Sequence, residues 1–119
     1  MKSSISSKAL PAIQERDALR ALNAVAGFGN RRISRLIEHL GSAAAAFSAP
    51  CDEVSRIAGI PLAAALNLKH FPVDEFLESD NRALAANKAR VVTLQDKDYP
   101  PQLLTLPDAP VVIYVVGEL

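Results

Sequence analysis

Glycine and proline interrupt the first two thirds of this chain at short intervals, and this spacing restricts that region to short helices. Between the interruptions, apolar residues recur three and four positions apart, as on one face of a helix. We therefore predict helices over residues 16–26, 30–40, 42–47, 50–58 and 61–68. Gly41 and Gly59 are expected to end two of these helices, Ser42 to cap the third, and Pro61 to lie in the first turn of the last.

The last third of the chain has a different pattern. A longer helix is expected to start near Pro72, and its inward residues are predicted to be Phe76, Leu77, Leu84 and Ala85. A short β-branched strand is expected over residues 90–95. The run "VVIYVVG", residues 111–117, is continuously apolar, which is typical of a strand buried on both faces of a parallel sheet. A mainly α-helical part followed by an α/β part is the expected fold class.

Charge and cysteine content exclude several classes of function. The chain has 13 basic and 13 acidic residues, so its overall charge gives no argument for nucleic acid. Its single cysteine, Cys51, excludes an intramolecular disulfide and a cysteine-rich zinc site. No apolar run reaches the roughly 18 residues that span a bilayer, and the first residues do not form a signal peptide. A cytoplasmic protein with no membrane partner is expected.

The sequence carries no pattern of an enzyme or a metal site. His39 and His70 are far apart in the sequence and have no cysteine or acid at ligand spacing, so no metal site is expected. There is no nucleophile–base pair and no glycine-rich loop of the G-x-G-x-x-G kind. We therefore expect no catalytic residues and no cofactor.

The segment "VAGFGNRRISR" carries the strongest chemical pattern. Two glycines flank Phe28 between two predicted helices, which suits a tight turn that another backbone can approach closely. The first amide groups of the second helix lack partners within that helix and lie at its positive end, where a phosphate binds well. The predicted DNA-backbone site consists of Gly27, Phe28, Gly29, Asn30, Arg31, Arg32 and Arg35.

This segment resembles the helix-hairpin-helix motif, a binder of the DNA backbone that does not read sequence. The alternative is a pair of helices whose glycines serve only the turn. A second segment, "IAGIP", repeats the pattern about thirty residues later, but Pro61 removes an amide that a phosphate would need. We expect this second hairpin to be structural and to pack against the first.

The C-terminal stretch resembles the DNA-processing protein A family (DprA, also called Smf). In that family a strand leads into Asp-x-x-Tyr-Pro, followed by a spaced leucine, a turn with Asp and Pro, and an apolar strand ending in Tyr-x-x-Gly. The matching residues here are Asp96, Tyr99, Pro100, Leu103, Leu104, Asp108, Pro110, Tyr114 and Gly117. The resemblance covers roughly residues 17–119.

The resemblance implies a fold, a function and partners. It implies a sterile-alpha-motif-like or double helix-hairpin-helix domain over 16–70. The flexible arm expected over residues 1–15 follows instead from the first residues themselves, which lack a sustained apolar core. A linking helix and the first strands of a truncated Rossmann-like domain would occupy 71–119. It implies single-stranded DNA binding in natural transformation, loading of the RecA recombinase, and a possible homodimer of the full-length protein. Tyr99, Pro100, Leu103, Pro110, Tyr114 and Gly117 would be scaffold.

Two further expectations follow. The helical part is either a DNA-binding accessory domain or an interaction or spacer module that only positions the Rossmann-like part. The apolar strand would have at best one neighbouring strand, which leaves an exposed edge and face. We therefore expect the chain to self-associate, or to be poorly ordered after Tyr99.

Overall fold

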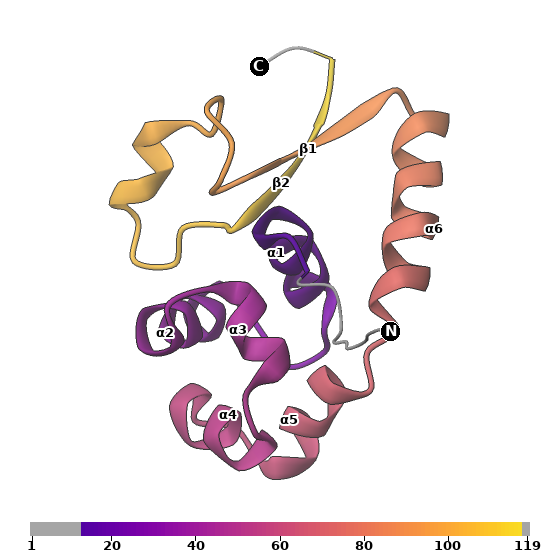
Figure 1. Ribbon diagram of the computed structural model, residues 1–119. Coiled ribbons are helices and arrows are strands. Elements are labelled where there is room, and N and C mark those ends of the chain that lie inside the picture. The colour runs from indigo at the N-terminus through magenta and orange to yellow at the C-terminus, as the bar shows by residue number, and fades with distance from the viewer. Residues whose placement is uncertain (1–12, 118–119) are drawn as a thin grey trace, which may run out of the picture.

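The computed structural model describes residues 13–117, which form a mainly helical protein with one small sheet. The predicted arm over residues 1–15 lies almost entirely outside the described residues. In Figure 1, α1 lies at the centre, with the other short helices below it, the two strands above it and α6 along one side. The elements are α1 (Glu15–Ala24), α2 (Asn30–Leu40), α3 (Ala43–Ser48), α4 (Cys51–Ala58), α5 (Leu62–Lys69), α6 (Val73–Ala86), β1 (Ala89–Thr93), the 3-10 helix η1 (Pro101–Thr105) and β2 (Val112–Val116).

Local sequence signals place most of the helix ends. Gly41 and Gly59 follow α2 and α4 in the left-handed conformation, with φ of 96° and 69°, where glycine carries no steric penalty. The Ser42 hydroxyl accepts a hydrogen bond from the Ala45 amide at 3.0 Å and so caps α3. These stop and cap predictions are confirmed. The first helix is shorter than predicted because Val25 already has an extended backbone.

The two hairpins pack against each other reciprocally, as expected. A Cβ on Gly27, in the first turn, would lie 3.7 Å from the Cβ of Ala64 in α5. The Asn67 side chain of α5 donates to the Ala26 carbonyl at 3.4 Å. In return, a Cβ on Gly59, in the second turn, would lie 3.7 Å from Arg35 of α2. Each turn therefore contacts a helix of the other hairpin.

The sheet differs from the parallel arrangement expected for an apolar strand. β1 and β2 pair antiparallel, with Ala89 opposite Val116 and Thr93 opposite Val112. The chain returns through η1 rather than through a crossover helix, and such a connection reverses the strand direction. β2 is also not buried on both faces, because Tyr114 and Val116 are 46% and 74% exposed. The segment after Tyr99 forms defined elements, and self-association remains a prediction.

Helix α6 is attached through both apolar and polar groups, with Leu84 packed against the hydrophobic core. None of its residues is buried, and the inward position predicted for Ala85 is wrong because that residue is exposed. Among the described elements, α6 packs chiefly on its sequence neighbour β1 and on α1. Arg20 of α1, only 4% exposed, donates to Asp80 at 2.9 Å and to Asn81 at 2.7 Å.

No helix in the described part of the chain is long and apolar enough to cross a membrane.

Candidate nucleic-acid interface

The glycine turn, residues 27–32, brings most of the predicted DNA-backbone residues together. Gly27 has a φ of 93°, a conformation that favours glycine. Phe28 is buried in the hydrophobic core beneath the turn, so it holds the turn in place and is not available to contact a ligand. Gly29 is the N-cap of α2, with an extended backbone (φ −84°, ψ 175°) that any residue adopts, and a Cβ there would meet nothing within 4 Å.

The start of α2 leaves backbone donors unused. Ile33 donates its amide to the Gly29 carbonyl at 3.0 Å. Within the described residues, the amides of Asn30, Arg31 and Arg32 have no hydrogen-bond acceptor. Such amides lie at the positive end of the helix and point outward along its axis, an arrangement that binds phosphate and carboxylate oxygens.

The three arginines of the site have different surroundings. Arg31 is exposed and, among the residues that the structure describes, has no ion-pair or hydrogen-bond partner. Arg32 donates to the Gly27 carbonyl at 3.0 Å and therefore helps to fix the turn. Arg35 is exposed beside Gly59 of the second hairpin. Within the described chain none of the three has an acidic partner, and Arg31 is the one of them in the first turn of α2 whose side chain makes no hydrogen bond.

The charges at the start of α2 oppose the stability of that helix. Acidic residues occupy the first turns of α1, α4 and α6, where they interact favourably with the helix dipole, whereas the first turn of α2 has none. Arg31 and Arg32 lie there instead. A charge of the wrong sign at a helix end costs about 0.3–1 kcal/mol, so these two arginines are not explained by the needs of the helix.

Asn30 has a contact that its sequence position did not indicate. Its side-chain oxygen accepts a hydrogen bond from the Val111 amide, just before β2, at 3.1 Å. The Asn30 side chain is therefore directed to the sheet, while its backbone amide remains at the open end of α2. Residues 81 positions apart in the sequence meet here, and no local pattern could have predicted the pair.

The residues of the Asp-x-x-Tyr-Pro region lie in and beside the sheet. Tyr99 is buried and its hydroxyl donates to the Pro110 carbonyl at 2.6 Å; burial raises the pKa of Tyr99. Leu103 is partly buried against the small hydrophobic cluster that Tyr99 forms with Val92 and Val115. Pro100 precedes η1, and Gly117, with a φ of 84°, follows β2.

Two ionisable residues of this region have shifted pKa values. Burial alone would raise the pKa of Asp96, but hydrogen bonds from the Thr93 amide and from Arg16 outweigh burial and lower it. Tyr114 donates to Asp80 at 3.2 Å. Burial and then the negative charge of Asp80 raise the pKa of Tyr114.

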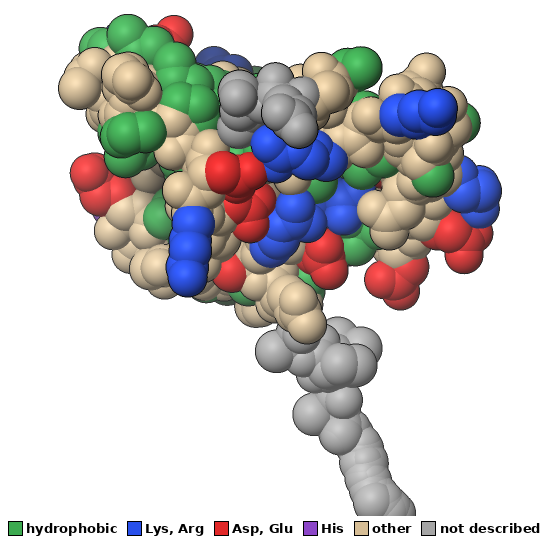
Figure 2. All heavy atoms as spheres, turned by 90° about the horizontal axis from the view of Figure 1, so that it is seen from above, with side chains coloured by type: hydrophobic (Ala, Val, Ile, Leu, Met, Phe, Trp, Pro, Cys, Tyr) green, Lys and Arg blue, Asp and Glu red, His purple; other side chains and the backbone are tan. Residues whose placement is uncertain are grey.

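The described part of the face over the two strands mixes basic and acidic side chains (Figure 2). Figure 2 views the molecule from above this face and shows blue and red side chains side by side at its middle. Arg16 pairs with Asp96 at 3.0 Å, and Arg90 pairs with Asp98. Because these cations already have acidic partners, the face above the sheet is a poorer phosphate site than the glycine turn.

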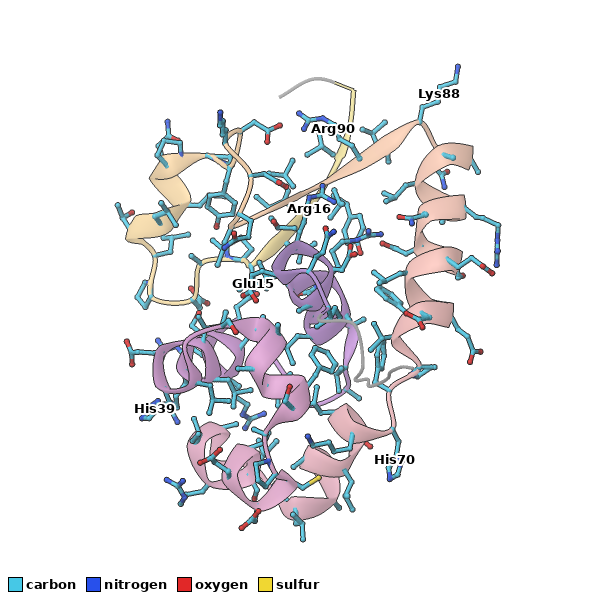
Figure 3. All side chains as sticks on the ribbon, viewed as in Figure 1. Glu15, Arg16, His39, His70, Lys88 and Arg90 are labelled. Carbon is cyan, nitrogen blue, oxygen red and sulfur yellow. The ribbon has the colours of Figure 1, made fainter. Side chains whose placement is uncertain are left out.

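Three functional or structural residues were missed by sequence reasoning. Glu15 and Arg16 begin α1 and reach different parts of the molecule, Glu15 to α3 and Arg16 to β1 (Figure 3). Arg20 joins α1 to α6. In the sequence all three look like charged residues on a solvated helix face, because their partners lie far along the chain.

The structure gives no metal-binding group in its described part, where no three His, Cys, Asp or Glu residues come close enough to hold an ion. His39 and His70 lie far apart, one at the end of α2 and the other after α5 (Figure 3). No family model, curated protein or solved structure matches this chain.

Proposed function

We propose that this chain binds the sugar–phosphate backbone of DNA, single-stranded in the parent protein, through its glycine turn. One observation carries the proposal: at the start of α2, three amides without an acceptor among residues 13–117 lie beside an open Gly29 and an Arg31 that has no partner in the same range. Phosphate oxygens accept hydrogen bonds from such amides, and the helix dipole and the arginine add favourable charge. The open space at Gly29 permits close approach of the ligand.

A site of this kind has predictable binding properties. Contacts to the backbone carry no sequence information, so affinity is nearly independent of base sequence. Binding releases counterions, so affinity falls with salt, with a logarithmic slope of about −0.7 per neutralised phosphate of a single strand. Few charges are involved, so we expect weak binding by this chain alone.

We extend the proposal to the DNA-processing protein A family. The reciprocal packing of the two hairpins supports a double helix-hairpin-helix or sterile-alpha-motif-like domain over residues 16–70. The bond from Tyr99 to Pro110 supports a scaffold role for the Asp-x-x-Tyr-Pro region. On this proposal β1 and β2 begin a Rossmann-like domain, the protein acts in natural transformation in the cytoplasm, and RecA is its protein partner. It is not an enzyme, and the full-length protein forms a homodimer.

A second function is favoured by two contacts of the same turn. The Asn30 side chain is bonded to Val111, and Arg32 is bonded to Gly27. The sequence predicted that both residues would contact the DNA backbone, whereas in the structure both side chains make hydrogen bonds within the protein. These contacts favour a spacer or interaction domain that positions the β1–β2 region without touching DNA.

A fluorescence-anisotropy titration distinguishes the two functions. Single- and double-stranded oligonucleotides of two sequences are titrated at low and high salt, with wild type, Arg31→Ala and the control Arg82→Ala. Arg82 lies on α6 and pairs with Glu78, so the control removes the same charge elsewhere. We expect Arg31→Ala to weaken binding about threefold to tenfold on every sequence, corresponding to one charged contact of about 1 kcal/mol. Combining it with Arg32→Ala should weaken binding further.

Absence of binding by the wild type at low salt would leave the spacer function. Equal loss of affinity in Arg31→Ala and Arg82→Ala would show that only overall charge matters, and the glycine turn would then not be the site.

A further inference from the structure

The entrance to β2 is held by contacts from three parts of the molecule. The Val111 amide donates to the Asn30 side chain at 3.1 Å, and the Val111 carbonyl accepts from the Leu94 amide at 3.2 Å. The neighbouring Pro110 has no amide, and its carbonyl accepts from the Tyr99 hydroxyl at 2.6 Å. Each of these backbone donors and acceptors therefore has its own partner, and Asn30 is the partner that comes from the helical part.

Val111 depends on this contact. Its side chain is fully buried, and a buried amide without an acceptor is strongly unfavourable. In the described chain, the Asn30 side chain is the acceptor that this amide has. The Asn30 side chain therefore helps to hold the start of β2, whose Val111 also packs in the hydrophobic core, at the start of α2.

Asn30 also belongs to the proposed phosphate site. Its backbone amide is the first of the three open donors of α2, and its side chain is bonded to the sheet. A ligand that fixes the backbone at Asn30 also fixes the side chain that holds Val111. By thermodynamic linkage, docking of β2 in turn fixes the amides that face the ligand.

We infer that Asn30 is a positioning residue that couples phosphate binding at the glycine turn to docking of the β1–β2 sheet. The inference rests on the proposed function and adds to it a link between two parts of the fold. It assigns Asn30 two separable roles, a backbone donor to the ligand and a side-chain acceptor for Val111.

Two substitutions separate these roles. Asn30→Ala removes the acceptor and leaves the backbone amide and all arginines in place. Asn30→Asp keeps an acceptor of the same shape for Val111 but adds a negative charge at the phosphate site. Asn87→Ala is the matched control, because Asn87 lies at the end of α6 and bonds only its own helix, at the Ala83 carbonyl.

The test combines amide hydrogen exchange, read by NMR, with anisotropy titration of an oligo-dT strand at low salt. We expect Asn30→Ala to exchange the Val111 amide at least tenfold faster and to bind the strand at least threefold more weakly. Asn30→Asp should keep Val111 exchange within about threefold of wild type and still lose binding, whereas Asn87→Ala should match wild type in both. In the wild type, bound oligo-dT should slow exchange at Val111.

Several results would overturn the inference. If Val111 exchanges at the wild-type rate in Asn30→Ala, then the Asn30 side chain does not protect the Val111 amide. This exchange rate is measured without any DNA. If Asn30→Ala exchanges Val111 faster but binds the strand with wild-type affinity, the contact is real but is not coupled to binding. No binding by the wild type would end both the proposed function and the coupling, while Val111 exchange would still decide whether Asn30 holds the sheet.

Discussion

The starts of α2 and α3 differ in how their backbone amides are satisfied. At α3, Glu15 accepts from the Ala43 and Ala44 amides at 2.6 and 3.0 Å, and Ser42 accepts from Ala45 at 3.0 Å. At α2, no acceptor in the described chain reaches the corresponding three amides. The same fold therefore closes one helix start completely and leaves the other open.

The charges at the two helix starts differ in the same direction. A carboxylate lies at the start of α3, which is the sign that the helix dipole favours. Arginines lie in the first turn of α2, the unfavourable sign. The charges therefore favour helix stability at the start of α3 and oppose it at the start of α2.

The largest expected effect is at the closed end. Glu15→Ala leaves two amides of α3 without their acceptor and should lower the free energy of unfolding by about 2 kcal/mol, at the upper end for a lost helix cap. Urea denaturation measures it. Glu38→Ala is the control, on the exposed surface of α2, where a change within about 0.5 kcal/mol is expected. Equal losses of unfolding free energy in Glu15→Ala and Glu38→Ala would contradict the claim that Glu15 caps the start of α3.

The next largest effect is the difference in stability between alanine substitutions at the two glycines of the turn. Gly27→Ala places a side chain at a φ of 93° and should destabilise the protein by about 1–2 kcal/mol. Gly29→Ala meets open space at an ordinary φ and should cost clearly less. Thermal unfolding followed by circular dichroism compares them. If Gly29→Ala is as harmful as Gly27→Ala, the fold itself requires both glycines, and the argument for a ligand at Gly29 fails.

A smaller effect is expected when a serine cap like that of α3 is introduced at the start of α2. Gly29→Ser introduces a hydroxyl that can accept from an open amide of α2, as Ser42 does in α3. We expect stability to rise by about 0.5–1 kcal/mol, a few tenths from the cap and the rest from the lower chain entropy of the unfolded state. Oligonucleotide affinity should fall, because the hydroxyl competes with phosphate. Chemical denaturation and anisotropy measure the two quantities. If stability and oligonucleotide affinity both rise in Gly29→Ser, the cap and the phosphate do not compete for the amides of α2.

The smallest expected effect concerns charge. Arg31→Glu replaces an unfavourable charge at the start of α2 by a favourable one and should raise stability by about 0.5 kcal/mol, while binding to DNA is lost. Arg82→Glu is the control and should be slightly destabilising, because it places a second acid beside Glu78. A loss of stability in Arg31→Glu would show that Arg31 has a structural contact after all.

Local features of the fold were predictable from the sequence. Gly41, Ser42 and Gly59 act on the backbone within a few residues, so their patterns indicate helix ends directly. The glycine turn was found for the same reason.

Long-range features could not be predicted in this way. Glu15 reaches amides 28 residues away, and Asn30 reaches an amide 81 residues away. The antiparallel pairing of β2 depends on how the chain returns through η1, which an apolar run such as residues 111–116 does not reveal. The polar attachment of α6 through Arg20 also needs tertiary structure, because an isolated arginine in a helix looks like a surface residue.

The proposed phosphate site depends most on the open amides of α2, and NMR tests them directly. A nitrogen-15-labelled wild-type chain is titrated with an oligo-dT strand at low and high salt. We predict chemical-shift changes at the Asn30, Arg31 and Arg32 amides that shrink at high salt, with no change at the capped Ala43, Ala44 and Ala45 amides. Changes confined to other regions, or equal changes at both helix starts, would contradict the claim that the open start of α2 binds phosphate.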